Sequence, residues 1–521
     1  MKRYLLRRIL FAIFSLLVVT GTVMFMTYNL INPDTILQGD PNKTKYKDNE
    51  LEIYKHNAFR DAGYETYVNF STYLVDIYTT KYGPDYAEEE SYLAAYQSLY
   101  DTENYTSNAD VISFSDTYSK QGYTITYYAP KYRFKKIISS PYLIAVKKFN
   151  VFERFANYLG SFFSFETIWD VQDPNLTDRY IRWEWDERSH MPALVGSGTT
   201  HKYLLYFDNK FPFVHQNFFH IRLGKSNSTY RGVDVTDVLS QNTGNVVFTD
   251  QEYPVDVGTG NTHSTSLDFH TVTYSSTVDA YSESVYGVGE HYINAEQSTS
   301  GLTRIGNSFV IGITSVVLVY IFGLPIGIWM AKRKDKLVDK IGNAYIVFIM
   351  AIPSLAYIFI FQAFGVMAGL QSKWSSDGFL PVMMILPVIS LALPSIGALM
   401  KWMRRYMIDQ SNADYVKFAR SNGMTEGEIF SKHISRNAFI YLVHGIPADI
   451  LFAMVGALIT ERVYAVPGIG GLLTNAVTAR DNGIVIAGTV FYTFLSITAL
   501  ILGDLLLAKY DPRVSFTNER G

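Results

Sequence analysis

The chain has 521 residues, of which 48% are hydrophobic and 18% are charged, and its net charge is −3. Soluble domains carry about 25% charged residues, so this composition with its long uncharged runs indicates a membrane protein rather than a soluble one. The near-neutral charge gives no reason to expect a nucleic-acid partner, and the lack of cysteine excludes disulfides and thiol-based metal sites.

The N-terminal segment is first basic and then apolar. Four Lys and Arg residues within Met1–Arg8 precede an uncharged run from Ile9 to Ile31. A signal peptide has an apolar region of about 7–15 residues and a small-residue cleavage site, whereas this run reaches the roughly 20 residues that cross a bilayer. We therefore expect a retained transmembrane helix over residues 1–31, with its N-terminus in the cytoplasm.

Residues 32–303 contain no run that is long and apolar enough to span a membrane. Aromatic and β-branched residues alternate in short stretches such as Tyr123–Tyr128, which is typical of strands, and Tyr86–Tyr100 has a helical pattern. The sequence predicts a large α+β domain, inserted after the first span and extracellular. His215 and His220 are five residues apart, which does not fit the H-E-x-x-H spacing of zinc sites, so we expect no metal site.

Apolar runs resume near Ile305 and predict five further helices, which form a C-terminal membrane core at 304–521. These helices are placed at about 305–331, 341–369, 380–403, 438–460 and 484–509. Basic residues cluster in the loop Lys332–Lys340 and in the segment 404–437. With both termini in the cytoplasm, each basic loop falls on the cytoplasmic side, as the positive-inside rule requires.

The segment Asp414–Glu428 has the pattern of a helix, a glycine stop and a second helix. Three residues have the i, i+3, i+4 spacing of one helix face, a glycine suits a left-handed cap, and a Thr-x-x-Glu box opens the next helix. These residues are Tyr415, Phe418, Ala419, Gly423, Thr425 and Glu428. The pattern by itself fits a surface connection between two spans as well as it fits a docking site.

This segment also resembles the cytoplasmic coupling loop, or EAA loop, of ABC importer permeases of the oligopeptide and dipeptide branch. The matching residues are Asp414, Tyr415, Val416, Ala419, Arg420, Gly423, Arg436, Asn437 and Ala438. Ser421 and Tyr441 depart from the family pattern. The resemblance implies an all-α polytopic membrane protein with six transmembrane helices and the type I ABC importer permease fold, with the α+β domain between helices 1 and 2.

Further segments resemble the same family, in the family's order. They are Ala351–Ser354, Leu391–Pro394, Thr460–Leu472, Ala479–Asp481, Gly503–Leu505 and Asp511–Val514. The resemblance covers residues 1–31 and about 301–521. Within the inserted domain, Lys202–Phe207 and Tyr230–Val238 resemble the family's short external loop, and the enlarged form is similar to the Ami-type oligopeptide permease of Gram-positive cocci. The resemblance implies a plasma-membrane protein of a Gram-positive bacterium.

The resemblance implies a transport subunit without its own ATPase site, and no catalytic constellation is found. Gly224-Lys225-Ser226 lacks the first glycine of a P-loop, because Phe219 stands there. The implied partners are a second homologous permease, two ATPase subunits that bind ATP and Mg²⁺, and a peptide-binding lipoprotein. The implied cargo is an oligopeptide. The alternatives are another cargo (nickel, glutathione or an oligosaccharide) and a membrane-anchored receptor.

The resemblance assigns the contact with the ATPase subunits to one group of residues. They are Asp414, Tyr415, Lys417, Phe418, Ala419, Arg420, Gly423, Met424, Thr425, Glu426 and Glu428. We expect Lys417 and Arg420 to pair with acidic residues of the ATPase, and Tyr415, Phe418 and Met424 to fill an apolar cleft. The alternative for these two cations is a solvated face near anionic lipid, which fits Lys417 better than Arg420.

Ionisable residues within spans indicate function, because they are costly in lipid. His444 and Asp449 in the fifth span are expected to line the substrate path. The structural alternative is that Pro447 kinks the helix and Asp449 pairs with the neighbouring permease. Asp504, in the sixth span, is expected to make a structural polar contact.

The external segment after the fifth span is the candidate gate. The residues concerned are Glu461, Arg462, Pro467, Gly468 and Gly470. A glycine-rich segment of this kind can fold back into a cavity, where its backbone is shielded from lipid. We favour an external gate element over an ordinary loop.

Overall fold

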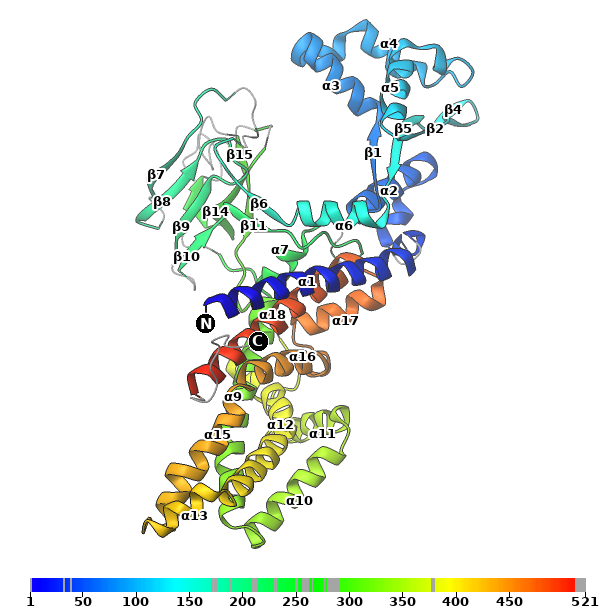
Figure 1. Cartoon of the computed structure of the whole chain (residues 1–521). Coiled ribbons are helices and arrows are strands. Elements are labelled where there is room, and N and C mark those ends of the chain that lie inside the picture. The colour runs from blue at the N-terminus through cyan, green and yellow to red at the C-terminus, as the bar shows by residue number, and fades with distance from the viewer. Residues whose placement is uncertain are drawn as a thin grey trace.

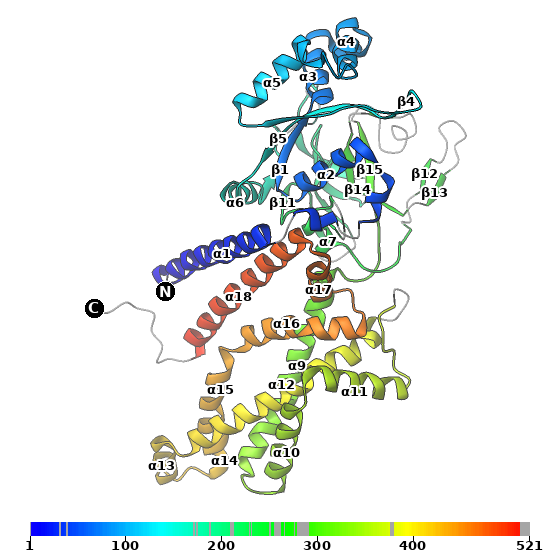
Figure 2. The same cartoon turned by 90° about the vertical axis from the view of Figure 1, so that its right-hand side faces the viewer.

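The structure is a computed structural model. It describes residues 2–30, 33–37, 40–169, 172, 176–186, 189–208, 213–228, 230, 232–248, 252–254, 262–264, 266–275, 277–278, 291–375 and 380–510. The molecule is elongated, with apolar helices at one end and the inserted domain at the other (Figure 1). In the view of Figure 2, α1 and α18 lie side by side between these two ends.

Four helices among the described residues are long and apolar enough to cross a membrane. They are α1 (Lys2–Leu30), α9 (Arg304–Lys332), α12 (Leu380–Ser411) and α18 (Asn482–Tyr510). Two bent helix pairs bring the number to as many as six if each pair is one span. The first pair is α10 (Leu337–Ala351) with α11 (Ser354–Met367), and the second runs from Glu426 to Tyr464.

The predicted single helix over 341–369 is wrong. The chain breaks after Ala351 and turns by 107° before α11 begins at Ser354. Pro353 explains the break, because a proline disfavours helical backbone at the preceding residue and cannot donate a backbone hydrogen bond. Ile352 accordingly has an extended conformation (φ −81°, ψ 129°).

The predicted span at 438–460 is part of a longer and interrupted helical segment. It contains α14 (Glu426–Glu428), the π-helix η5 (Ile429–Ser435), α15 (Arg436–Val443) and α16 (Ile446–Tyr464). Its two halves meet at a 48° bend. Pro447 lies in the first turn of α16, where a missing N–H costs nothing, so the bend precedes the proline. Likewise, α12 extends to Ser411, beyond the predicted end at 403.

The centre of the helical region is the packing of α9 against α12. Gly327 of α9 approaches so closely that a Cβ there would lie 2.9 Å from the Cβ of Met403 and 3.0 Å from the carbonyl oxygen of Met400. Small residues allow this close approach between membrane helices. A core of buried apolar side chains from α9, α12, α13 and α15 continues from this contact toward the end farthest from the inserted domain.

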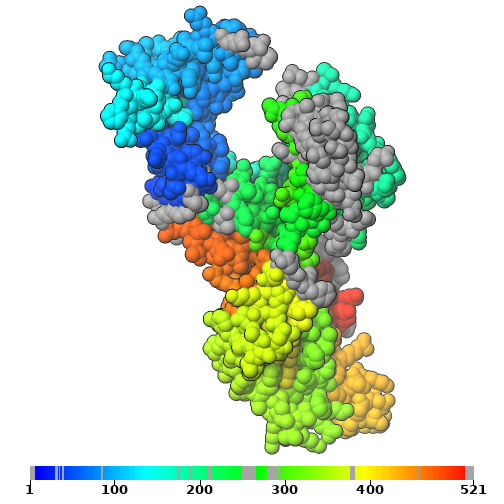
Figure 3. Space-filling model, turned by 180° about the vertical axis from the view of Figure 1, so that it is seen from behind, coloured from blue at the N-terminus to red at the C-terminus, as the bar shows by residue number. Residues whose placement is uncertain are grey.

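The inserted domain is α+β, as predicted, and has two lobes that stand apart in the space-filling view of Figure 3. The first lobe has a three-stranded antiparallel sheet in the order β1-β5-β2. Its elements are α2 (Asp48–Asp61), β1 (Glu65–Asn69), α3 (Phe70–Tyr82), α4 (Glu90–Ser98), α5 (Ala109–Lys120), β2 (Thr124–Tyr128), β3 (Lys131–Arg133), β4 (Lys136–Ser139) and β5 (Tyr142–Lys148). The strand and the helix expected near 123–128 and 86–100 correspond to β2 and α4.

The second lobe is mostly β and follows the connecting helix α6 (Val151–Gly160). Its main sheet has the order β10-β9-β8-β7, and the pairs β11-β6, β12-β13 and β14-β15 accompany it. The strands are β6 (Phe163–Phe165), β7 (Ile181–Asp186), β8 (Met191–Gly196), β9 (Tyr203–Phe207), β10 (Val214–Gln216), β11 (Phe219–Ile221), β12 (Glu252–Pro254), β13 (Thr262–Ser264), β14 (Leu267–Tyr274) and β15 (Tyr292–Gln297). The short helix α7 (Val235–Ser240) contacts α9 and α18.

A fully buried carboxylate fixes the inserted domain to the helical region. Asp481, before α18, accepts hydrogen bonds from the Ser226 hydroxyl (2.5 Å) and from the backbone N–H groups of Asn227 and Ser228 (3.2 Å each). It also accepts from the N–H of Ile484 at 3.2 Å. The Lys225-Ser226 segment, which does not fit a P-loop, is therefore one of the contacts between the two parts of the chain.

Candidate functional site

The segment Asp414–Glu428, here called the coupling segment after the role expected of it, has the predicted local structure. Helix α13 (Asp414–Ser421) ends before Gly423, which has φ +82°. The Thr425 hydroxyl accepts a hydrogen bond from the N–H of Glu428, and the Glu428 carboxylate accepts from the N–H of Thr425. The left-handed glycine and the capping box are both confirmed, and they set the angle between α13 and the following helix.

Helix α13 buries one face in the core of the protein and exposes another. Val416 and Ala419 are buried in the apolar core, and Tyr415 and Met424 pack at its edge. Phe418 is 69% exposed. At about 100° per residue, Phe418 lies roughly 160° around the helix from Val416. Tyr415, Phe418 and Ala419 have the predicted helical spacing, and Phe418 is an exposed aromatic side chain.

The charged residues of the coupling segment pair with one another at the surface. Lys417 Nζ lies 2.8 Å from Asp414 Oδ1, and the Arg420 guanidinium donates two hydrogen bonds to the Glu426 carboxylate, at 2.5 and 3.1 Å. The hydrogen bond and charge of Lys417 lower the pKa of Asp414. Exposed pairs of this kind are screened by solvent and contribute little to stability, so a partner protein can exchange them at little cost.

Asp449 lies in a groove on the helical region. Its carboxylate accepts a hydrogen bond from the Tyr320 hydroxyl at 2.6 Å. The groove has a volume of about 450 Å³, and its aromatic lining comes from α9, α11, α12, α15 and α16. That lining consists of Tyr320, Tyr357, Trp402, Tyr406, Tyr441 and Phe452. His444, expected beside Asp449, is exposed at the break between α15 and α16 and does not line this groove.

Glu461 lies in the interior rather than at an open mouth. It is fully buried, accepts a hydrogen bond from the Ser308 hydroxyl at 2.6 Å and accepts another from the N–H of Gly471 at 3.1 Å. The Ser308 oxygen in turn accepts from the N–H of Ile469 at 3.0 Å. The carboxylate therefore caps the N-terminus of α17 (Ile469–Ala479), where negative charge is favourable.

The glycines beside Glu461 allow this close packing. A Cβ at Gly468 would lie 2.3 Å from Glu461 Cδ, and one at Gly470 would lie 2.6 Å from Leu458 Cα. The Pro467 carbonyl accepts a hydrogen bond from the Asn307 amide at 3.0 Å. Arg462 is exposed and donates to Asn475 Oδ1 at 3.2 Å. The segment after α16 is thus largely a helix, which the sequence reasoning missed.

Two ion pairs each join two of the helices. Arg8 of α1 lies 2.6 Å from Asp504 of α18, which confirms the expected structural contact of Asp504. Arg404 of α12 donates to both oxygens of Asp339 of α10, at 2.6 and 2.7 Å. The sequence reasoning missed this second pair, because both residues lie in segments that were considered only for their positive charge.

The chain is similar in sequence to known transport proteins. Residues 323–516 match the family described as binding-protein-dependent transport system inner membrane component. The chain is 31% identical to the oligopeptide transport system permease protein AmiC of Streptococcus pneumoniae, over 100% of both chains. It is 29% identical to the dipeptide transport system permease protein DppB of Bacillus subtilis, over 40% of this chain and 67% of that one. A solved structure of the MetNI methionine ABC transporter covers 39% of this chain and 93% of its own, at 14% identity and a TM-score of 0.31.

Proposed function

The chain belongs to the binding-protein-dependent ABC importer permeases, and on this basis we propose that it forms half of the transmembrane pathway for oligopeptide uptake. The oligopeptide cargo is supported by the full-length similarity to AmiC, which includes the inserted domain. As a multi-pass membrane permease, it uses energy from ATP hydrolysed by other subunits. In this proposal two ATPase subunits bind ATP and Mg²⁺, a second homologous permease completes the pathway, and a peptide-binding lipoprotein delivers the cargo.

In the proposed topology the chain crosses the plasma membrane of a Gram-positive bacterium six times. Each bent helix pair then counts as one span, both termini are cytoplasmic, and the inserted domain is extracellular. The basic loops at 332–340 and 404–437 support this orientation. The coupling segment and the inserted domain lie at opposite ends of the molecule (Figure 1), which is consistent with one facing the ATPases and the other facing the lipoprotein.

The exposed Phe418 is the observation that carries the proposal. A helix tip that presents one large aromatic side chain, surrounded by exchangeable surface ion pairs, is suited to insertion into an apolar cleft of another protein. The opposite face of α13 carries Val416 and Ala419 into the core formed with α12 and α15. Helix α13 packs on η5, and η5 contacts both α12 and α15, so a displacement of α13 would reach these two helices through η5.

The same two helices line the groove that contains Asp449. Trp402 and Tyr406 come from α12 and Tyr441 from α15. We infer that closure of the ATPase pair moves α13, that α12 and α15 follow, and that the groove then opens alternately toward the two sides of the membrane. Facing the second permease, this groove would be half of the peptide pathway, with Asp449 as its anionic group.

The outer gate is proposed at the junction of α16 and α17. Asp449 lies near the start of α16 and Glu461 near its end, where Glu461 caps α17. A movement of α16 would therefore shift α17 at the outer mouth. Arg462, exposed on the same helix turn, is available to face the pathway or the second permease.

A pull-down of the tagged chain in mild detergent tests the proposal. The wild-type chain should retain two ATPase chains and a second permease, and Phe418→Ala should lose the ATPases while it keeps the permease. Phe134→Ala, which removes a 91% exposed phenylalanine from the inserted domain, is the matched control and should retain every partner. Uptake of a labelled oligopeptide, with nickel, glutathione and an oligosaccharide as competitors, tests the cargo. Recovery of the wild-type chain without ATPase subunits would refute the proposed coupling.

A further inference from the structure

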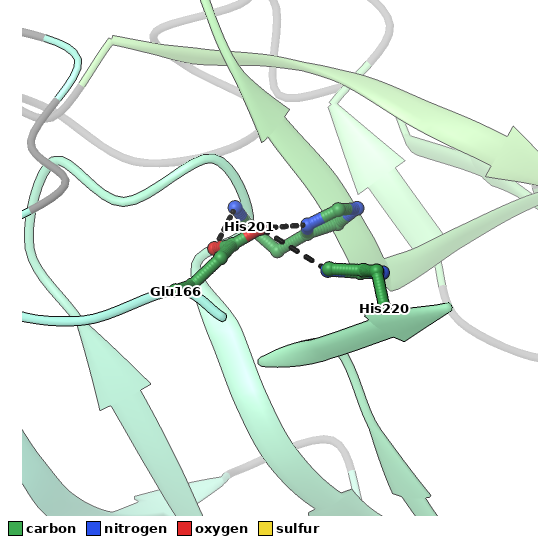
Figure 4. A group of neighbouring side chains, drawn as sticks. All are labelled: Glu166, His201 and His220. Atoms are coloured by element: carbon green, nitrogen blue, oxygen red, sulfur yellow. Dashed lines mark hydrogen bonds and ion pairs between the residues drawn. The ribbon is translucent and has the colours of Figure 1, made fainter. Parts of the chain in front are cut away.

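Three side chains from separate segments of the second lobe converge beside a polar cavity. Glu166 follows β6, His201 precedes β9, and His220 lies in β11 (Figure 4). His201 Nδ1 lies 2.8 Å from Glu166 Oε1, and His220 Nε2 lies 3.4 Å from the same oxygen. The two imidazole rings are stacked, with their centroids 5.5 Å apart.

The spacing of these groups matches the ligands of a small divalent ion. One atom from each residue lies within 4.8 Å of the corresponding atom of the other two. Zinc ligands at 2.0–2.2 Å from the ion in tetrahedral geometry lie about 3.4 Å apart. Glu166 Oε1 lies 2.8 Å from His201 Nδ1, below this value, and 3.4 Å from His220 Nε2, at this value, so small side-chain movements would open a position between the three groups.

The surrounding structure holds the three groups in place. The backbone N–H of His201 donates to Glu166 Oε2 at 3.1 Å, and the N–H of Glu166 donates to the Phe218 carbonyl at 2.7 Å. His220 Nε2 contacts the carbonyl oxygen of Asn217 at 2.9 Å.

The cavity beside the cluster leaves room for a further ligand. Its volume is about 740 Å³, and Asp237 of α7 and Glu296 of β15 also line it. A site with two imidazoles and one carboxylate suits Zn²⁺ and similar transition metals, whereas Ca²⁺ prefers six to eight oxygen ligands. Water or one of the two additional carboxylates would complete a four-coordinate ion.

We propose that Glu166, His201 and His220 bind a divalent transition metal ion of the Zn²⁺ class in the inserted domain. The ion would join the β6-β11 pair to the segment that leads into β9, and would stiffen the lobe next to α7, which packs on the membrane helices. The expectation of no metal site came from the spacing of His215 and His220, but His215 pairs with Asp208 at 2.9 Å. The inference does not depend on the transported cargo.

Metal binding by the full-length chain tests this proposal. The protein is purified through a tag that contains no histidine, stripped with a chelator, and titrated with Zn²⁺ in competition with a chromophoric chelator. We expect one tight equivalent per chain. Glu166→Gln, His201→Gln and His220→Gln should each lower the affinity at least about tenfold, since even residues around the ligands change metal affinity by about 10–100-fold.

His56→Gln is the matched control, because His56 also pairs with a glutamate, Glu65, at 2.5 Å, and otherwise contacts the Tyr128 hydroxyl. This variant should bind Zn²⁺ like the wild type. Visible absorption of Co²⁺ bound to the wild-type chain gives a second readout that needs no variant, and tetrahedral coordination with histidine nitrogen ligands is expected. Wild-type protein that binds no Zn²⁺, or three variants that bind it as tightly as the control does, would overturn the proposal and leave a hydrogen-bonded cluster only.

Discussion

Asp481→Ala should loosen the inserted domain from the membrane helices. The fully buried carboxylate accepts hydrogen bonds from the hydroxyl of Ser226 and from the backbone N–H groups of Asn227, Ser228 and Ile484. Each buried donor left without an acceptor costs about 1–3 kcal/mol. Water can enter the space left by the truncated side chain and accept some of these hydrogen bonds. We therefore expect the free energy of local opening to fall by about 3 kcal/mol.

Hydrogen exchange followed by mass spectrometry on the full-length chain measures this loss directly. Because about 1.4 kcal/mol corresponds to a tenfold change in an equilibrium, the amides of residues 226–228 and of Ile484 should exchange about 100-fold faster in Asp481→Ala. Peptides from β2 and β5 should be unchanged, since they lie in the other lobe.

Asp101→Asn is the matched control. The Asp101 carboxylate also accepts hydrogen bonds from backbone N–H groups, those of Glu103 and Asn104, but it lies in an exposed turn. Its loss should leave exchange at residues 226–228 unchanged. If Asp481→Ala accelerates exchange at those amides less than about threefold, the buried carboxylate is not what holds the two parts together.

Three further predictions concern the coupling segment, the groove and the second lobe. Gly423→Val places a β-branched residue at φ +82°, which costs about 1–2 kcal/mol, and should reduce recovery of ATPase subunits in the pull-down. Asp449→Asn keeps a hydrogen-bonding oxygen but removes the charge, so uptake of lysine-rich peptides should fall about tenfold while uptake of neutral peptides is unchanged. His270 lies between Asp186 and Asp268; burial lowers its pKa, but hydrogen bonds to the two carboxylates outweigh this and raise it to about 9. A raised pKa stabilises the protonated folded state, so about 3 kcal/mol present below pH 6.5 should be lost as the pH rises through 9. Thermal unfolding of the full chain should therefore show a pH dependence that His270→Gln reduces.

Each of these predictions has a contrary result. If both Gly423→Ala and Gly423→Val recover the ATPase subunits as well as the wild type does, the left-handed cap is not needed for docking. Equal loss of cationic and neutral peptide uptake in Asp449→Asn would indicate a structural role for that residue. A wild-type melting temperature that is constant between pH 6.5 and 9 would show that His270 is not held protonated by its two aspartates.

The local features of the sequence determined much of the molecule. Long uncharged runs located the apolar helices, because only a helix satisfies its own backbone in lipid. The Gly423 cap and the Thr425 box were correct, since both depend on residues within one turn of chain. The break at Pro353 was also encoded locally, although the apolar pattern on both sides concealed it.

Tertiary packing decided which side chains meet. Phe418 and Ala419 have compatible positions in the helical pattern, and the core to which α12 and α15 contribute determines that Val416 and Ala419 are buried and Phe418 is exposed. Helical periodicity determines which residues share a face of a helix, but the rest of the chain determines which face packs against the core.

The polar clusters depended on the fold most of all. Ser226 and Asp481 are 255 residues apart, and Glu166 and His201 are 35 residues apart, yet each pair is in hydrogen-bond contact. No spacing rule links such residues, because their separation in space is set by how the inserted domain packs on α17 and α18 and by how its strands pair. The sequence by itself therefore determined a membrane permease and the local structure of the segment proposed to contact the ATPases. Only the tertiary structure placed the buried Asp481 contact between the two parts of the chain and brought together the side chains of the proposed metal site.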